Sequence, residues 1–525
     1  MMWQPTPASK NQMRQTIKIH ESDNVAVAVT PLSADARIAD GFPEVVTASE
    51  IPRGHKIALA DLEIGQPIIK YGFTIGRATQ KIRSGDWIHT HNLETMLGQN
   101  VEYHYCPSNA NSRPRSGVVT PPAGDLRRED APTRKEFNGY RRANGKTGTR
   151  NEIWIINTVA CVNNAAERIA RAAHEQFAAG NIDGIYAFPH PYGCSQLGDD
   201  LKATQKVLAG LLNHPNAGGV LVLGLGCENN AIKYFVDEIG GFNPARVKFL
   251  NAQDVEDEVE EGLKLVAELA KHADTFQREP RPLADLVIGM KCGGSDGLSG
   301  VTANPLVGCI SDRLSDGGGT AIISEVPEMF GAEQILMNRA RDEEVFRSIV
   351  EVINGFKDYY RRHGQPIFEN PSPGNKEGGI TTLEEKSLGA IQKGGRATVT
   401  QVLRYGERAT EPGLVLLESP GNDGVSATAE AVAGANLILF TTGRGTPLGV
   451  PAPTIKISTN TELALKKPKW IDFDAGVILS GAKTLGQSTD ELLDFILRVA
   501  SGEVRAKNEL NGFREITIFK TGVTL

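Results

Sequence analysis

Four runs of sequence decide the fold: IWIINTVAC (residues 153–161), GIYAFPHPYGC (184–194), GVLVLGLGC (219–227) and ADLVIGMKC (284–292). Each run is apolar, rich in Val, Ile and Leu, and stops at a cysteine. Patterns with helical spacing, such as AAERIARAAHEQF and LKATQKVLAGLL, lie between them. Buried runs that alternate with helices predict parallel strands joined by crossover helices. The four cysteines therefore fall at the carboxyl ends of strands, where open α/β sheets bind ligands.

The composition is that of an ordinary globular protein. The 525 residues are 40% hydrophobic and 23% charged, and a chain of this length is expected to divide into about three domains. A net charge of -7 argues against nucleic acid or an anionic membrane as a partner. No run approaches the ~20 apolar residues of a membrane helix and the first residues lack an apolar signal core, so we expect a cytoplasmic protein. Six cysteines in so long a chain do not form a disulfide framework.

The order of patterns predicts an α/β protein with a small β-rich module in front. Residues 16–95 contain short strand-like runs separated by turns. Residues 96–133 are dense in Pro, Ser, Asn and Gly and predict a linker. We expect two doubly wound parallel-sheet domains to follow, at 134–280 and 281–525, with their loops facing each other across a cleft.

Two further expectations concern the C-terminal domain. Residues 332–363 (AEQILMNRARDEEVFRSIVEVINGFKDYYRRH) have helical spacing throughout and predict one long helix. Residues 370–386 (NPSPGNKEGGITTLEEK) are polar and rich in Pro and Gly, which predicts a loop.

The strand-end cysteines are candidate metal ligands. Cys161, Cys194, Cys227 and Cys292 are each flanked by small or polar residues, and His190 lies four residues before Cys194. Thiolates suit soft or borderline metals. Zinc bound by four thiolates is structural, whereas mononuclear Fe(2+) or an iron–sulfur cluster with one open position supports catalysis. Buried structural thiols are the alternative, since none of the cysteines forms a C-x-x-C pair.

Other polar groups have two interpretations each. His89 and His91 share one face of a predicted strand and form either a metal or carboxylate site or a surface pair. Arg150, in the loop before the first cysteine-ended strand, either binds a substrate carboxylate or belongs to a basic surface turn. No stretch fits a dinucleotide or Walker phosphate fingerprint, which disfavours a dinucleotide-dependent oxidoreductase.

Long blocks of this chain resemble the altronate/galactarate dehydratase family over nearly the whole length. The blocks are RGHKIAL, DWIHTHN, YRRANGKTGTRNE, HPYGCSQLGDD, GLGCENN, CGGSDGLSGVTANP, ENPSPGNKEGGITTLEEKSLG, TTGRGTP and WIDFDAG. The resemblance implies an N-terminal SAF-type domain and a hydro-lyase of hexuronate catabolism outside the enolase superfamily. It also implies conversion of D-altronate to 2-dehydro-3-deoxy-D-gluconate with ferrous iron, and the HTHN segment at 89–92 favours the altronate branch.

Dehydration of a sugar acid suggests roles for the polar strand-end residues. His190 is the first candidate for the base and Glu228 the second. Arg150 and Arg444 are candidates for holding the carboxylate. Candidates for binding the hydroxyl groups are Asn151, Asn229, Ser295, Asp296 and Thr446. Dehydration of galactarate or a related acid, and a sugar-acid binding protein without turnover, stay open as alternatives. The oligomeric state, a homo-oligomer among the options, is not readable from the sequence.

Overall fold

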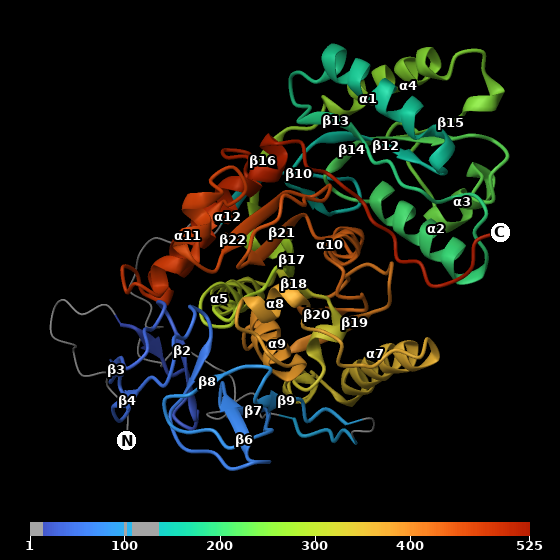
Figure 1. Ribbon diagram of the computed structural model, residues 1–525. Helices are drawn as coiled ribbons and strands as arrows, with labels where there is room; N and C mark the ends of the chain where they lie inside the picture. The colour runs from blue at the N-terminus through green and yellow to red at the C-terminus, as the bar shows by residue number, and fades with distance from the viewer. Residues whose placement is uncertain (1–13, 99–101, 108–135) are drawn as a thin grey trace.

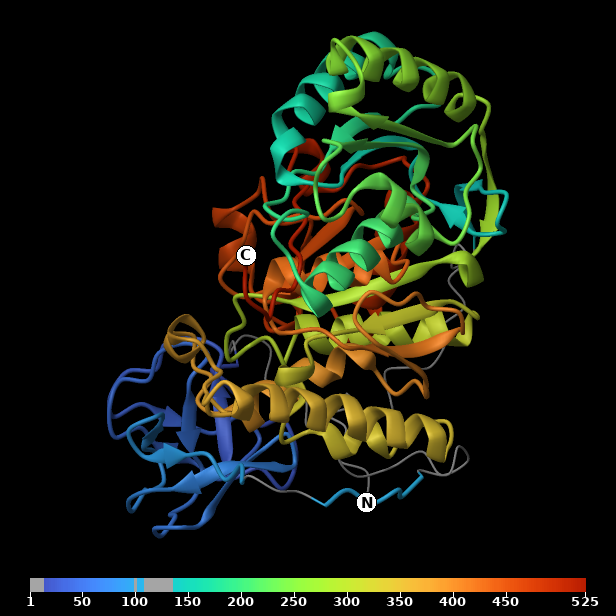
Figure 2. The ribbon, with the colours of Figure 1, turned by 90° about the vertical axis from the view of Figure 1, so that its right-hand side faces the viewer.

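The computed structural model describes residues 14–98, 102–107 and 136–525. Three parts follow one another in space (Figure 1): the N-terminal β-rich module, a central domain built on a seven-stranded sheet, and the second domain of the chain. Figure 2 shows the N-terminal module and the second domain at opposite ends of the molecule. Of the linker predicted over 96–133, residues 99–101 and 108–133 lie outside the described residues.

The N-terminal module consists of three small antiparallel sheets, ordered β1-β2-β5-β8, β6-β7-β9 and β3-β4. Their strands are β1 (Thr16–Ile17), β2 (Val25–Ala28), β3 (Arg37–Ile38), β4 (Val45–Val46), β5 (Lys56–Ala58), β6 (Pro67–Lys70), β7 (Phe73–Ala78), β8 (Trp87–Ile88) and β9 (Leu93–Glu94). Gly54, with φ +83°, comes so close to the C-terminal domain that a Cβ there would lie 2.9 Å from the carbonyl oxygen of Gly378. The module therefore packs directly on that domain.

The second domain contains a parallel sheet in the order β13-β12-β14-β15. Its strands are β12 (Glu152–Asn157), β13 (Gly184–Ala187), β14 (Ala217–Gly224) and β15 (Val247–Asn251). Its helices are α1 (Asn163–Phe177), α2 (Gly198–Leu212), α3 (Ile232–Ile239) and α4 (Glu258–Ala273), with η1 (Ala160–Val162) and η2 (Ala252–Asp254). Alternate residues of β12 face opposite sides: Ile153 and Ile155 pack toward α1 and α4, and Trp154 and Ile156 toward α2 and α3. The predicted doubly wound arrangement is confirmed.

A small antiparallel sheet, β11-β10-β16, connects the second and C-terminal domains. It is formed by β10 (Glu136–Arg141), β11 (Thr147–Gly148) and β16 (Arg278–Pro282).

The C-terminal domain contains a parallel sheet in the order β19-β20-β18-β17-β21-β22-β23. Its strands are β17 (Val287–Cys292), β18 (Thr320–Ile323), β19 (Val399–Leu403), β20 (Gly413–Leu417), β21 (Leu437–Thr442), β22 (Thr454–Ser458) and β23 (Phe473–Asp474). Helices α5 (Ala303–Asp316) and α12 (Leu485–Ala500) share one core with the sheet, and α10 (Asp423–Val432) packs on a separate core. Strands β18, β20 and β19 lie on one side of β17, and the later strands β21, β22 and β23 lie on the other side. The strand order therefore reverses between β17 and β21. Ligands of such folds bind outside the carboxyl ends of the strands at this point.

Two predictions about this domain are corrected. The long helical stretch divides into α6 (Glu333–Met337) and α7 (Glu343–Arg362), because Asp342 caps a new helix by accepting a bond from the Val345 amide. The polar stretch 370–386 forms α8 (Pro373–Glu377) and the start of α9 (Leu383–Ala390), and most of α9 is buried under the N-terminal module. The shorter elements of the domain are η3 (Leu283–Asp285), η4 (Val326–Met329), η5 (Ile391–Gly394), α11 (Thr461–Lys466), η6 (Ala475–Ile478) and α13 (Lys507–Leu510).

The C-terminal tail returns to the second domain. The amide of Thr517 donates to Thr428 Oγ1 on α10, and the amide of Thr521 donates to Asp200 Oδ1 on α2. The amide of Leu525 donates to the carbonyl oxygen of Ser195 over 3.0 Å. The tail thus runs from α10 to the second domain, where the red segment ends near α2 in Figure 1.

Candidate active site at the edge of the seven-stranded sheet

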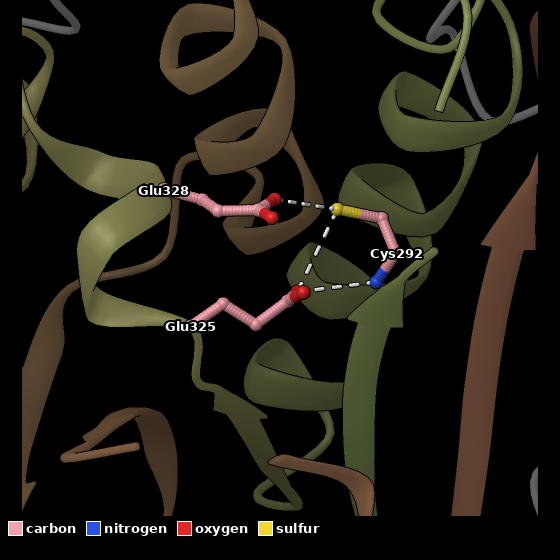
Figure 3. A group of neighbouring side chains, drawn as sticks. All are labelled: Cys292, Glu325 and Glu328. Atoms are coloured by element: carbon pink, nitrogen blue, oxygen red, sulfur yellow. Dashed lines mark hydrogen bonds between the residues drawn. The ribbon is translucent and has the colours of Figure 1, made fainter. Parts of the chain in front are cut away.

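Acidic and basic side chains are buried together where β17 and β18 end. Cys292 is the last residue of β17, and Glu325 and Glu328 follow β18, in and beside η4. Glu325 has a left-handed backbone (φ +68°) that turns its side chain toward β17. Its Oε2 accepts the Cys292 amide over 3.1 Å. The Cys292 Sγ lies 3.6 Å from Glu325 Oε2 and 3.6 Å from Glu328 Oε2 (Figure 3).

Three lysines neutralise this group. Lys393 Nζ lies 2.9 Å from Cys292 Sγ and 2.6 Å from Glu325 Oε2. Lys291 pairs with Glu325 and, over 2.9 Å, with Asp423 at the start of α10. Lys386 pairs with Glu328 over 2.8 Å.

The electrostatics fix which of these groups are charged. Burial opposes ionisation of Glu325, but Lys291 and Lys393 outweigh it and hold the pKa of this carboxyl at about 2. Burial, reinforced by Glu325, raises the pKa of the Cys292 thiol to about 12. Against the effect of burial, Cys292 and Glu325 raise the pKa of Lys393 above its ordinary value. At neutral pH the group is therefore an ion network around a neutral thiol.

By distance alone, Cys292, Glu325 and Glu328 are a candidate metal site, since one ligand atom of each lies within 4.8 Å of the others. The charge balance does not fit a resident cation. The three lysines match the three carboxylates of Glu325, Glu328 and Asp423, so a divalent ion would add uncompensated charge at a buried position. The ferrous iron that the family resemblance implies does not suit these residues.

An outer layer of polar residues surrounds the ion network. Lys386 also donates to Asn375 Oδ1, and the Asn375 side chain donates to the carbonyl oxygen of Ser295. Ser295 and Lys386 line a small cavity to which Tyr71 of the N-terminal module also contributes. Asp296 lines it too, but its carboxylate accepts bonds from Ser299 and Thr459 and holds the loop after β17.

Arg444 and Thr446 follow β21 at the same edge. The Arg444 guanidinium is about half exposed, lies 3.1 Å from Glu377 and donates to the carbonyl oxygen of Gly374. Thr446 Oγ1 accepts the Leu448 amide, which shapes the turn. The predicted residues Ser295, Asp296, Arg444 and Thr446 thus come from two loops at the switch point of the sheet.

Aromatic rings of the N-terminal module cover this edge. His55 and His89 stack with ring centroids 5.0 Å apart, and Trp87 contacts both of them and His91. His89 Nε2 lies 2.9 Å from the carbonyl oxygen of Lys376, and His55 Nε2 lies 3.1 Å from that of Glu377. Burial lowers the pKa of His55 to about 4 and also lowers the pKa of His89. His89 therefore belongs to the surface that docks on the C-terminal domain, whereas His91 is exposed and contacts Trp87.

The other three predicted cysteines lie in the second domain. Cys161, Cys194 and Cys227 are exposed and follow β12, β13 and β14. Because Cys292 belongs to the other sheet, the structure separates it from these three, and the predicted site of four thiols is divided.

The candidate bases His190 and Glu228 hold the loops that carry these cysteines. His190 Nε2 lies 2.8 Å from the Asn157 carbonyl oxygen, and Nδ1 accepts the Tyr192 amide, so both ring nitrogens are engaged. Burial lowers the pKa of His190. The Glu228 carboxylate accepts bonds from Thr158 and from the amides of Leu225 and Gly226. Burial opposes its ionisation, but these donors outweigh burial and lower its pKa.

Arg150 and Asn151 lie at the opposite end of β12 from the cysteines. Arg150 is fully buried, with Nε and Nη2 bonded to the carboxylate of Glu509 over 2.7 and 2.8 Å. Asn151 donates to the carbonyl oxygens of Asn181 and Ala273. Arg150 thus joins the second domain to the C-terminal domain, and Asn151 holds segments of the second domain together.

Comparison with known proteins agrees with this architecture. Family models match three consecutive regions: the altronate/galactarate dehydratase SAF domain at residues 14–96, the second domain of D-galactarate dehydratase/altronate hydrolase at 139–274, and the C-terminal domain of D-galactarate/altronate dehydratase at 283–524. The chain belongs to the altronate/galactarate dehydratase family. Within this family, it is 48% identical to altronate dehydratase of Escherichia coli over 97% of this chain and 100% of the relative.

Two further relatives define its place in the family. Altronate dehydratase of Bacillus subtilis is 47% identical over 98% of this chain and 100% of its own length. Galactarate dehydratase (L-threo-forming) of Escherichia coli is 34% identical over 96% of each chain. Among the described residues of this family member, no helix is long and apolar enough to cross a membrane.

Sequence patterns alone do not identify Glu325, Glu328 or Lys393 as site residues. Glu325 and Glu328 occur in SEVPE, which follows an apolar run just as the cysteines do. This position at the end of a predicted strand is the feature of the sequence that could have indicated a role in the site. Lys393 follows α9, and nothing in its neighbourhood indicates that it contacts Cys292.

Proposed function

We propose that the protein is a cytoplasmic hydro-lyase that converts D-altronate to 2-dehydro-3-deoxy-D-gluconate. The similarity to two altronate dehydratases carries this proposal, because it extends over their whole length at 47–48% identity, against 34% for the galactarate enzyme. The proposed site is the edge of the seven-stranded sheet under the N-terminal module.

The reaction removes the C2 proton and the C3 hydroxide and leaves an enol that becomes the 2-oxo acid. Because the C2 proton of a hydroxy carboxylate is weakly acidic, stabilisation of the enediolate is the main requirement. Arg444, a half-exposed cation beside the switch point, is our candidate for binding the carboxylate. Lys386 and Lys393 are buried ammonium donors, each held in place by a glutamate, so they need no reorganisation as negative charge develops.

Glu328 is the best-placed base in this network. Its Oε1 is held by Lys386 and by Asn370, whereas its Oε2 contacts the Cys292 thiol at 3.6 Å. Glu325, in contrast, is bonded to two lysines and to a backbone amide, and is poorly basic. His190 has both ring nitrogens bonded to the backbone, which makes it a weaker candidate than Glu328.

Turnover of D-altronate and galactarate by the purified protein, with product identified by mass spectrometry, tests the proposal. We expect D-altronate to be dehydrated and the Glu328→Gln variant to lose about 10²–10⁴ in kcat, the usual contribution of an acid–base group. Glu411→Gln, at an exposed pair with Arg341, is the matched control and should retain full activity. Exclusive turnover of galactarate would refute the substrate, and binding of either acid without turnover would refute the hydro-lyase.

A further inference from the structure

Three exposed thiols are gathered at one edge of the second domain. Strands β13 and β14 flank β12 in a parallel sheet, so Cys161, Cys194 and Cys227 leave the same edge on neighbouring loops. Cys161 is in η1, directly after β12, and the other two are in the loops that precede α2 and α3.

Hydrogen bonds join these three loops directly. The Ala160 amide donates to the carbonyl oxygen of Tyr192 over 2.9 Å, which connects the Cys161 and Cys194 loops. The Asn230 amide donates to the carbonyl oxygen of Gly193 over 2.9 Å, which connects the Cys194 and Cys227 loops. The Asn230 side chain donates to the Thr158 carbonyl oxygen, which closes the triangle. Each bond lies within three residues of a cysteine.

The approach of the loops is as close as the backbone permits. A Cβ at Gly193, which has φ +103°, would lie 2.0 Å from the Thr158 carbonyl oxygen, so only glycine fits there. Asn229 Oδ1 accepts the Ser195 amide over 2.9 Å. With His190 and Glu228 bonded as described above, the neighbouring polar side chains hold the loops, and the thiols are left facing outward.

The thiols themselves have weak contacts. The Gln253 side-chain amide lies 3.5 Å from Cys227 Sγ, and Ser195 Oγ lies 4.0 Å from Cys194 Sγ. An N–H or O–H donor beside a sulfur is the environment of metal-bound thiolates, whose electron density it tunes.

A single metal ion and an iron–sulfur cluster require different spacings of their thiolate ligands. One tetrahedral metal with metal–sulfur bonds of ~2.3 Å brings its sulfur ligands to about 3.8 Å from one another. Within residues 14–98, 102–107 and 136–525, however, these thiols do not form a group with ligand atoms within 4.8 Å. An iron–sulfur cluster binds each thiolate through a different iron and therefore accepts wider spacing.

We propose that Cys161, Cys194 and Cys227 bind a [4Fe–4S] cluster whose fourth iron has no protein ligand. On assembly from two ferrous ions, two ferric ions and four sulfide ions, the three thiols lose their protons to solvent and form three iron–sulfur bonds, with no change of oxidation state. The open iron would be a Lewis-acid site for an oxygen ligand. This cluster site would supply the iron that the buried Cys292 group does not accommodate, and its formation does not depend on which acid is the substrate.

Anaerobic reconstitution of the full chain with equal amounts of ferrous and ferric iron and with sulfide tests the proposal. We expect roughly four irons and four acid-labile sulfides per chain, with the electron paramagnetic resonance signal of a [4Fe–4S] cluster after reduction. Replacing Cys161, Cys194 or Cys227 singly with Ser should abolish the stable cluster. Cys106→Ser, which removes another exposed thiol, should leave it intact.

A second measurement uses the wild-type protein, so its result does not depend on whether a variant folds. In the reconstituted wild-type protein, the three cysteines should be shielded from alkylation, while Cys106 reacts as it does in the metal-free protein. Iron without sulfide, no bound iron after reconstitution, or full cluster content in the Cys194→Ser variant would each overturn the proposal. None of these outcomes depends on turnover, so failure of the proposed function would be recognised separately.

Discussion

The contact between the N-terminal module and the C-terminal domain depends on one buried carboxylate. Glu385 on α9 pairs with Lys56 on β5 over 2.9 Å and with Lys70 on β6 over 2.7 Å. It also accepts two bonds from Thr381. The three charged side chains are at most 1% exposed. Because one carboxylate serves two ammonium groups, burial lowers the pKa of Lys56 to about 8, while Glu385 outweighs burial and raises that of Lys70.

Replacing Glu385 with Gln leaves two buried ammonium groups without a counter-charge. Breaking a buried ion pair by removing one partner costs about 3–5 kcal/mol. If this cost falls on the undocking and opening of the module, amide exchange there should accelerate by roughly a hundred- to a few thousand-fold, since ~1.4 kcal/mol corresponds to a factor of ten. Hydrogen–deuterium exchange followed by mass spectrometry, on peptides that cover β5 to β7, measures this acceleration.

Two variants control the experiment. Glu44→Gln breaks the pair with Arg37 within the same module, and because both of these side chains are at least half exposed we expect little change in exchange. The triple variant Lys56→Met, Lys70→Met and Glu385→Leu removes all three charges and should recover most of the protection. Exchange in Glu385→Gln that matches the Glu44→Gln variant would refute the reasoning.

Two more predictions concern cysteine reactivity and pH. In the metal-free native protein, iodoacetamide at pH 8 should label the exposed thiols of Cys161, Cys194 and Cys227. It should not label Cys292, whose thiol is buried and has a pKa of about 12. Rapid labelling of Cys292, detected by mass spectrometry, would contradict the buried environment of this thiol. Burial lowers the pKa of His214 to about 3, so the unfolded chain binds a proton that the folded chain excludes. Its contribution to stability is complete above pH ~6.5 and is lost as the pH falls, by about 1.4 kcal/mol per pH unit between pH 6 and 4. Denaturant titrations should show a shallower pH slope for His214→Gln, and an unchanged slope would disprove the assignment.

The fold was predictable because its main signal is local. Runs such as GVLVLGLGC are apolar on both faces, which is typical of strands in a doubly wound sheet, and the helical patterns between them determine the parallel connection. The cysteines indeed follow strands in both sheets. The domain boundary expected between residues 280 and 281 places β17 in the C-terminal domain, where the structure also has it, and this position separates Cys292 from the other three cysteines.

The buried ion network was beyond prediction for a different reason. Arg150 meets its partner Glu509 across 359 positions of sequence, and Lys393 meets Cys292 across 101. From the sequence alone, a charged residue before or after a strand could face solvent, bind substrate or pair with a buried residue, and only the identity of its partner distinguishes these cases. The two acidic residues of SEVPE therefore carried no more signal than many exposed glutamates.

The course of the C-terminal tail affects how the protein should be prepared. Residues appended after Leu525 would begin beside Ser195, the neighbour of Cys194. An oligohistidine tag at that end would bring imidazole groups to three exposed thiols and compete for the same transition metals. A tag on the N-terminal module would lie at the other end of the molecule (Figure 1). The measured metal content would then report metal bound by the protein and not by the tag.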